Sequence, residues 1–144
     1  MDPGARRRAC VAFRGKLSRD TGVTLAAATC ESLVGTTFKD QGEGGELVTL
    51  QSNPGRFYSG LGAAIMDQQL LLGHPDHEKV AWWCSREAAE VHTHPAGMRL
   101  LAGSLFHGQG ATEDPAQAAV WFQKAADLGD TVGKAKLGAL LVDG

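Results

Sequence analysis

The clearest helical pattern of apolar residues lies at residues 114–130, in DPAQAAVWFQKAADLGD. Apolar residues recur there at positions i, i+3, i+4, i+7 and i+8, which places them on one face of an α-helix. They are Ala118, Trp121, Phe122, Ala125 and Ala126. Asp114 and Pro115 predict the helix start, because aspartate caps free amides and proline fits the first turn. Gly129 stands where a left-handed C-terminal cap is expected, so the pattern predicts a helix over about 115–128.

The sequence around this helix repeats after 36 residues, as the step from Gly97 to Gly133 shows. Gly97, Leu101, Ala102, Leu105 and Gly108 recur as Gly133, Leu137, Gly138, Leu141 and Gly144. The unit is therefore a helix near 97–107, a Gly-rich loop, the capped helix, a turn, and the next helix near 133–143.

A degenerate copy of the unit precedes the complete one. Gly62, Met66, Leu70 and Gly73 correspond to Gly97, Leu101, Leu105 and Gly108, and Asp76, Trp83 and Ala88-Ala89 correspond to Asp114, Trp121 and Ala125-Ala126. Relative to the complete unit, its loop is about three residues shorter, and its second helix and the following turn are each about one residue longer.

These residues resemble the Sel1-like repeat family over about 60–144, and the resemblance does not extend to 1–59. The positions that match the family pattern are Gly108, Gly110, Asp114, Ala118, Trp121, Phe122, Lys124, Ala125, Ala126 and Gly129, followed by Leu137 and Gly138 in the next copy. The resemblance implies an all-α fold, an α/α solenoid of antiparallel helix pairs in which each pair needs a neighbour. Gly97 and Gly133 depart from the family's alanine, which predicts helices weaker by roughly 0.5–1 kcal/mol each.

The first part of the chain shows weak periodicity and several glycines. We expect residues 1–59 to form a poorly ordered extension that holds a short β-hairpin, with strands at Thr36–Lys39 and Glu46–Gln51 joined through 40–45. The sequence Asn53-Pro54-Gly55 is read as a turn. The predicted organisation continues with a degenerate repeat at 60–96, a complete repeat at 97–132 and a truncated one at 133–144.

Composition narrows the functional classes. A formal charge of −2 and a pI near 6.2 provide no basic field for nucleic acid. No apolar run approaches the ~18 residues that a membrane span needs. Three cysteines, an odd number without close pairing, favour reduced thiols in an intracellular protein. The cytoplasm is thus the expected location, and Arg6, Arg7 and Arg8 leave import into an organelle as the alternative.

Catalytic and metal chemistry find little support in the sequence. His74 and His77 precede a predicted helix and His92 and His94 follow it, so the two pairs are roughly 20 Å apart at 1.5 Å per residue. A zinc ion needs all its ligands at about 2.0–2.3 Å. Cys84 falls on the apolar stripe of that helix, which predicts a buried structural thiol. We therefore predict no metal, cofactor or catalytic residue.

The predicted function is a non-catalytic scaffold or adaptor that binds a protein or peptide. Sel1-like proteins generally act as scaffolds, and stacked helix pairs present a long concave surface. The positions that the repeat pattern leaves free on the first helix of the complete unit are the candidate contacts: Arg99, Gly103 and His107. The alternative is a regulatory module of an enzyme whose catalytic part lies in 1–59 or beyond residue 144.

The last predicted helix has no following partner helix in this sequence. Its apolar residues Leu137, Leu140, Leu141 and Val142 would therefore lack part of their cover. A piece of a longer repeat array is the favoured explanation. Self-association through this helix and coverage by residues 1–59 are the alternatives. We expect marginal stability or self-association of the isolated chain.

Overall fold

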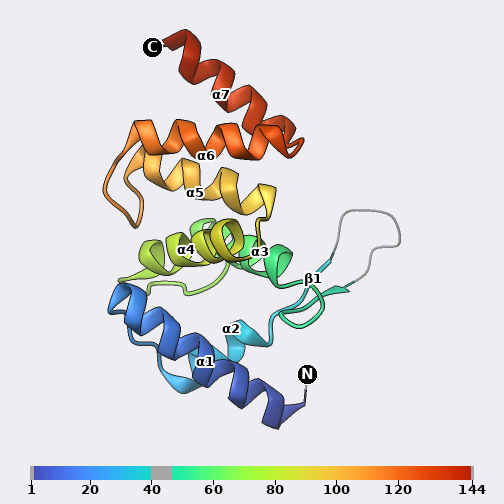
Figure 1. The fold of residues 1–144 in the computed structure, drawn as a ribbon. Helices are drawn as coiled ribbons and strands as arrows, with labels where there is room; N and C mark the ends of the chain where they lie inside the picture. The colour runs from blue at the N-terminus through green and yellow to red at the C-terminus, as the bar shows by residue number, and fades with distance from the viewer. Residues whose placement is uncertain (1, 40–46, 144) are drawn as a thin grey trace.

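The computed structural model describes residues 2–39 and 47–143, and these residues form a stack of helices with one small hairpin. The elements are α1 (Pro3–Thr21), α2 (Ala27–Val34), β1 (Phe38–Lys39), β2 (Leu47–Val48), α3 (Pro54–Met66), α4 (His77–Arg86), a π-helical turn (Glu87–Val91), α5 (Pro95–His107), α6 (Pro115–Asp127) and α7 (Thr131–Asp143). Successive helices are layered one on another, and the two ends of the chain lie at opposite ends of the stack (Figure 1). The prediction of an all-α solenoid is confirmed.

An ordered helix pair occupies the start of the chain, which corrects the expectation of a poorly ordered extension. The Asp2 carboxylate accepts a hydrogen bond from the Ala5 amide (2.7 Å), Pro3 follows at the first helical position, and Gly22 closes α1 with a φ of 78°. Asp2-Pro3 is thus the same start signal as Asp114-Pro115, here followed by an arginine cluster.

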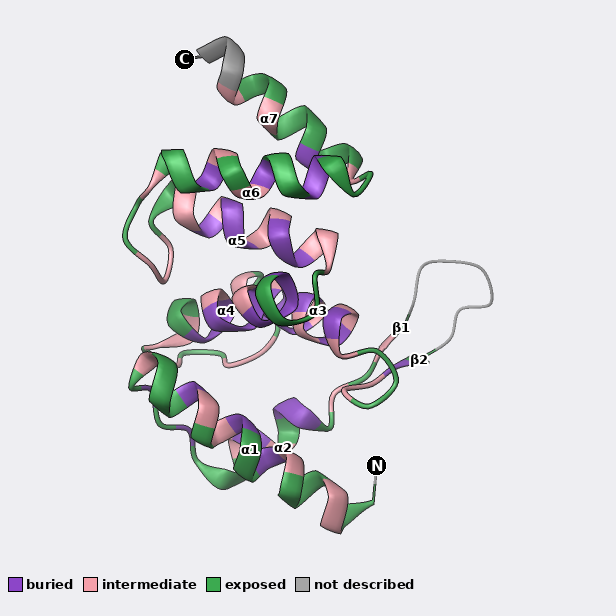
Figure 2. Ribbon diagram, in the orientation of Figure 1, coloured by how far each residue is buried: buried purple, intermediate pink, exposed green. Residues whose placement is uncertain are grey.

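The apolar face of α1 is narrow and lies between arginines and small residues, so it is easily missed in the sequence. Its buried members are Cys10, Phe13 and Leu17, at i, i+3 and i+7. The pair is completed from α2 and the connector by Val23, Leu25, Cys30, Leu33 and Val34, all buried in the same core. The outward face of α1 remains exposed (Figure 2). These residues therefore begin the stack.

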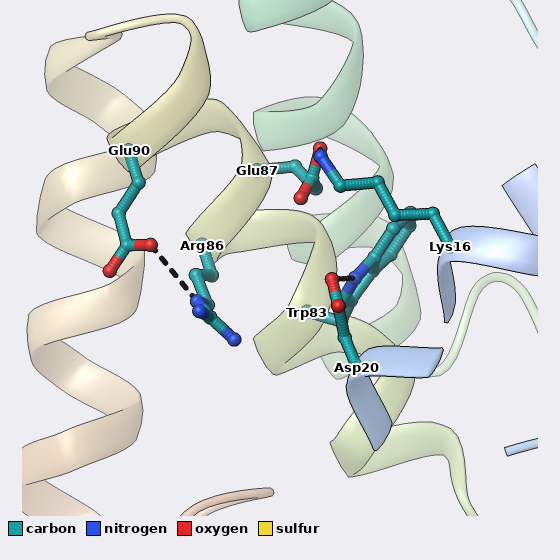
Figure 3. A network of polar contacts seen from close by, with 6 residues as sticks. All are labelled: Lys16, Asp20, Trp83, Arg86, Glu87 and Glu90. Carbon is teal, nitrogen blue, oxygen red and sulfur yellow. Dashed lines mark hydrogen bonds and ion pairs between the residues drawn. The ribbon is translucent and has the colours of Figure 1, made fainter. Parts of the chain in front are cut away.

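Polar contacts join α1 to the second half of α4 and the π-helical turn (Figure 3). Lys16 Nζ lies 2.7 Å from Glu87 Oε2, and the Glu87 side chain is only 7% exposed. The Trp83 indole N–H donates to Asp20 Oδ2 at 2.9 Å, while Phe13 packs edge-on against the Trp83 ring at 5.0 Å. A carboxylate this deeply buried needs a paired cation, so the Lys16 contact helps to fix the position of α1.

The predicted hairpin is present in a shorter form and packs against α3. Phe38 pairs with Val48 and Lys39 with Leu47 in an antiparallel arrangement. The Phe38 ring packs edge-on against Phe57 at 5.7 Å, which supplies the apolar support that a lone hairpin lacks. The predicted connection at 40–45 lies outside the described residues.

Helix α3 runs through the predicted boundary at residue 60. Its first turn is capped by Asn53, whose Oδ1 accepts from the Arg56 amide at 3.1 Å, so Asn53-Pro54 begins a helix rather than a free turn. The helix ends at Met66, and Leu70 therefore lies in the loop before α4 rather than on the helix. Leu70 therefore corresponds to Leu105 in the sequence repeat but not in the structure, where Leu105 lies on a helix.

The π-helical turn explains the extra residue of the degenerate copy. Trp83 and Ala88 are five residues apart, whereas Trp121 and Ala125 are four apart. A π-helical turn accommodates one added residue within a continuous helix, and Glu87–Val91 supplies it. Ala88 consequently remains fully buried against the next helix.

The complete repeat folds as predicted. Asp114 Oδ1 accepts from the Gln117 amide at 3.1 Å, and Gly129 is left-handed with a φ of 91°. Position 110 requires a glycine for two reasons. Its φ is 76°, and a Cβ there would lie 2.2 Å from the Glu78 carbonyl oxygen. Trp121 packs against both apolar clusters to which α5 and α6 contribute, so it lies at the seam between these helices.

Helix α7 packs on this unit, and its apolar residues Leu137 and Leu140 are partly covered, whereas Val132 is exposed. Leu137 and Leu140 contact the cluster formed by Ala102, Ala118 and Phe122. The side chains of Leu141 and Val142, and Gly144, lie outside the described residues.

Candidate partner-binding groove

A groove opens between α5, α6 and α7 on the side of the stack that carries the predicted contact residues. It encloses about 350 Å³. We call it the α5–α7 groove. Its lining residues are Arg99, Gly103, Phe106, His107, Phe122, Val132, Lys136, Ala139 and Leu140. Arg99, Gly103 and His107 lie at i, i+4 and i+8 of α5, so they form one row along that helix. The structure therefore brings all three predicted residues to one cavity.

The same row borders a second, smaller depression on the other side of α5. This depression measures about 160 Å³ and reaches Met66 of α3 and Ser85 of α4. Arg99, Gly103 and His107 line it as well. The two depressions thus reach from α3 and α4 on one side to α6 and α7 on the other, with the α5 row between them.

Small residues keep the α5–α7 groove open. A Cβ added at Gly103 would meet no atom within 4 Å among the described residues. The 36-residue offset of the repeat takes Gly103 to Ala139, which also lines the groove. Larger side chains at these two positions would occupy the space between α5 and α7.

Arg99 is also part of the structure that orients α7. Its Nε donates to Asp130 Oδ2 at 3.1 Å, and the same oxygen accepts from the Gly133 amide at 2.7 Å. Asp130 therefore caps the first turn of α7 and holds Arg99 at the edge of the groove. This ion pair could not be predicted from local sequence, because Asp130 lies 31 residues from Arg99.

Sequence reasoning missed the α7 wall of the groove. Val132, Lys136 and Leu140 line it. Their spacing of four residues on a predicted helix was available as a signal, as was the offset from Gly103 to Ala139. The wall was missed because these residues were considered only as an uncovered face, not as part of a cavity.

Other cavities lie outside this groove, and one of about 660 Å³, between the start of α4 and the loop after α5, is lined by the ionisable residues Asp76, His77, Glu78 and Lys79. Another, about 670 Å³, lies between α2 and the loop before α4, and His74 is the one titratable residue in its lining. In the described ranges, no three His, Cys, Asp or Glu side chains come together as metal ligands would. The same part of the chain holds no helix long and apolar enough to cross a bilayer.

The cysteines are buried and chemically quiet. Cys10, Cys30 and Cys84 are all free thiols in the interior. Burial raises the pKa of the Cys84 thiol far above its usual value, and the nearby Glu87 carboxylate raises this pKa further. A thiol needs the opposite environment to act as a nucleophile at neutral pH, so Cys84 fits the predicted structural role.

Comparison with known proteins agrees with the geometry. The architecture defines an α/α solenoid with a lined groove between α5, α6 and α7. Residues 95–130, which span α5 and α6, match the family model described as Sel1 repeat, so this segment of the chain is a Sel1-like repeat. No curated protein and no solved structure matches the chain. Sel1 repeats generally mediate protein–protein interaction and are typically non-catalytic.

Proposed function

We propose that this chain is a non-catalytic adaptor whose α5–α7 groove holds a short segment of another protein. The observation that carries the proposal is the convergence of Arg99, Gly103 and His107 on one cavity between consecutive repeat helices. These are the positions that the repeat pattern leaves free of structural duties, apart from the Arg99 ion pair.

The size and lining of the groove support a short segment rather than a folded domain. A volume of about 350 Å³ holds a few side chains, in the range typical of sites that enclose small ligands. Apolar walls beside a few polar groups are the usual composition of such sites. A protein segment that inserts side chains here would continue along the row on α5 into the neighbouring depression.

The test is a selection of binding peptides on the full chain, with Gly103→Leu as the variant that fills the groove. A random twelve-residue peptide display library is selected on the unaltered protein, and the enriched peptides are measured against the variant. We expect binding to fall at least tenfold, because the added side chain enters the space that the ligand needs.

A matched control comes from Gly15, an exposed glycine inside α1 at which a Cβ also meets nothing within 4 Å. Gly15→Leu makes the same chemical change far from the groove and should leave peptide binding unaltered. Thermal melting of both variants verifies that each remains folded. Peptides that bind Gly103→Leu as well as the unaltered protein would contradict the proposal.

A further inference from the structure

The α5–α7 groove carries charge of one sign. Arg99, His107 and Lys136 are the ionisable groups in its lining, and all three are basic residues. The nearest described acid is Asp130, whose carboxylate is already engaged by the Arg99 guanidinium and the Gly133 amide. The whole chain has a formal charge of −2, so this basic lining contrasts with the overall balance.

The basic groups surround an apolar wall. Phe106, Phe122, Val132, Ala139 and Leu140 supply it. Phe122 is almost fully buried and forms part of the core, while Val132 remains 43% exposed. An occupant therefore meets apolar surface and positive charge within one small site.

We propose that the groove selects a protein segment in which an aspartate or glutamate stands beside an aliphatic or aromatic side chain. This inference rests on the proposed function and specifies its partner. An arginine has five N–H donors, and the Arg99 contact to Asp130 uses the one on Nε, so the guanidinium retains donors for a second carboxylate. Lys136 adds a point charge from the opposite helix.

Electrostatic complementarity separates this partner from others. A basic segment would bring like charge against Arg99 and Lys136, which opposes binding. A wholly apolar segment would fill the wall but would desolvate Lys136 without supplying it with a counter-charge, which is costly. A segment that combines the two chemistries avoids both penalties.

The test uses the peptides from the display selection, restricted to those that lose binding in Gly103→Leu. We expect acidic residues within one or two positions of a large apolar residue in these peptides. Fluorescence anisotropy of a labelled synthetic peptide then measures affinity for the full chain carrying Lys136→Glu. A loss of at least about tenfold is expected, because the variant removes one charge-assisted contact and sets a carboxylate against the acidic residue of the peptide. Raising the salt concentration should also weaken binding.

Lys134→Glu is the matched control, because Lys134 is an exposed lysine on the same helix outside the groove lining. It changes the net charge equally and should alter affinity much less. An equal loss in the two variants would overturn the inference, since it would indicate a general field. Groove-dependent peptides that are basic or uncharged would overturn it while the proposed function stands. Finding no groove-dependent peptide would overturn both.

Discussion

The close approach of α5 to the π-helical turn reverses the expected effect of a glycine substitution. Gly97 replaces the alanine of the family pattern, and sequence reasoning alone predicts that Gly97→Ala strengthens α5. In the structure, a Cβ at this position would lie 2.4 Å from the Ala88 Cβ and 3.0 Å from the Ala89 amide nitrogen. Neither atom belongs to the end of a flexible side chain, so the helices themselves would have to move apart.

The magnitude follows from comparing Gly97 with Gly103 on the same helix. At Gly103 the added methyl meets nothing within 4 Å, so Gly103→Ala should stabilise the protein by about 0.5–1 kcal/mol through helix propensity alone. At Gly97 that gain is no larger, and overpacking of this kind costs about 1–3 kcal/mol. The two variants should therefore differ by about 1–3 kcal/mol in free energy of unfolding, with Gly97→Ala the less stable.

The assay is urea denaturation followed by far-ultraviolet circular dichroism, with the unaltered protein measured in parallel. Equal m-values would show that both variants expose the same surface on unfolding, so that differences in the urea midpoint report differences in stability directly. The midpoint should rise for Gly103→Ala and fall for Gly97→Ala. Stabilisation of Gly97→Ala by as much as Gly103→Ala would refute the packing of α5 against Ala88.

Three further predictions follow from the contacts described above. Asp130→Ala removes the cap at Gly133 and the partner of Arg99, so it should cost about 1–3 kcal/mol in urea denaturation, and a loss below 0.5 kcal/mol would contradict the cap. Iodoacetamide should modify Cys84 only after unfolding, as mass spectrometry of native and denatured samples checks; rapid native modification would contradict its burial. Burial and the nearby Arg56 and Arg99 side chains lower the pKa of His94 in the folded state. The free energy of unfolding should therefore decrease as the pH falls below about 6.5, and His94→Gln should flatten this dependence between pH 7 and 5.5. If His94→Gln kept the pH dependence of the unaltered protein, this dependence would not come from His94.

The helices from residue 95 onward could be predicted because each local signal agrees with the others. Asp114, the apolar stripe and Gly129 specify one helix, and the structure places its ends within one residue of the prediction. The repeat then extends the interpretation to α5 and α7. In this region the sequence carries both the apolar periodicity of the helices and the residues that start and end them.

The first helix pair could not be predicted from periodicity, because α1 buries only a thin stripe and contacts much of its surroundings through polar groups. Its attachment depends on partners distant in sequence, as in Lys16 with Glu87 and Asp20 with Trp83. Such pairs cannot be inferred from a local window. The start signal Asp2-Pro3 is present in the sequence, but no wide apolar stripe follows it to support a helix.

Only the α5 side of the groove could be predicted, because its α7 side again depends on contacts between residues distant in sequence. The row of Arg99, Gly103 and His107 follows from helical spacing, whereas the α7 wall depends on how closely α7 approaches α5. That approach is set by the Asp130 contacts and by the small residues at the turn. Only the structure shows that the two helices leave a space between them rather than packing in full contact.

The most direct test of the central claim is to map a bound peptide on the full chain by ¹⁵N nuclear magnetic resonance. A peptide selected on the unaltered protein is titrated into the labelled protein, and the amide shift changes are followed residue by residue. The account predicts the largest changes at Arg99, Gly103 and His107 on α5 and at Lys136 and Ala139 on α7. Changes confined to α1 and α2, or to the loop between α3 and α4, would contradict it.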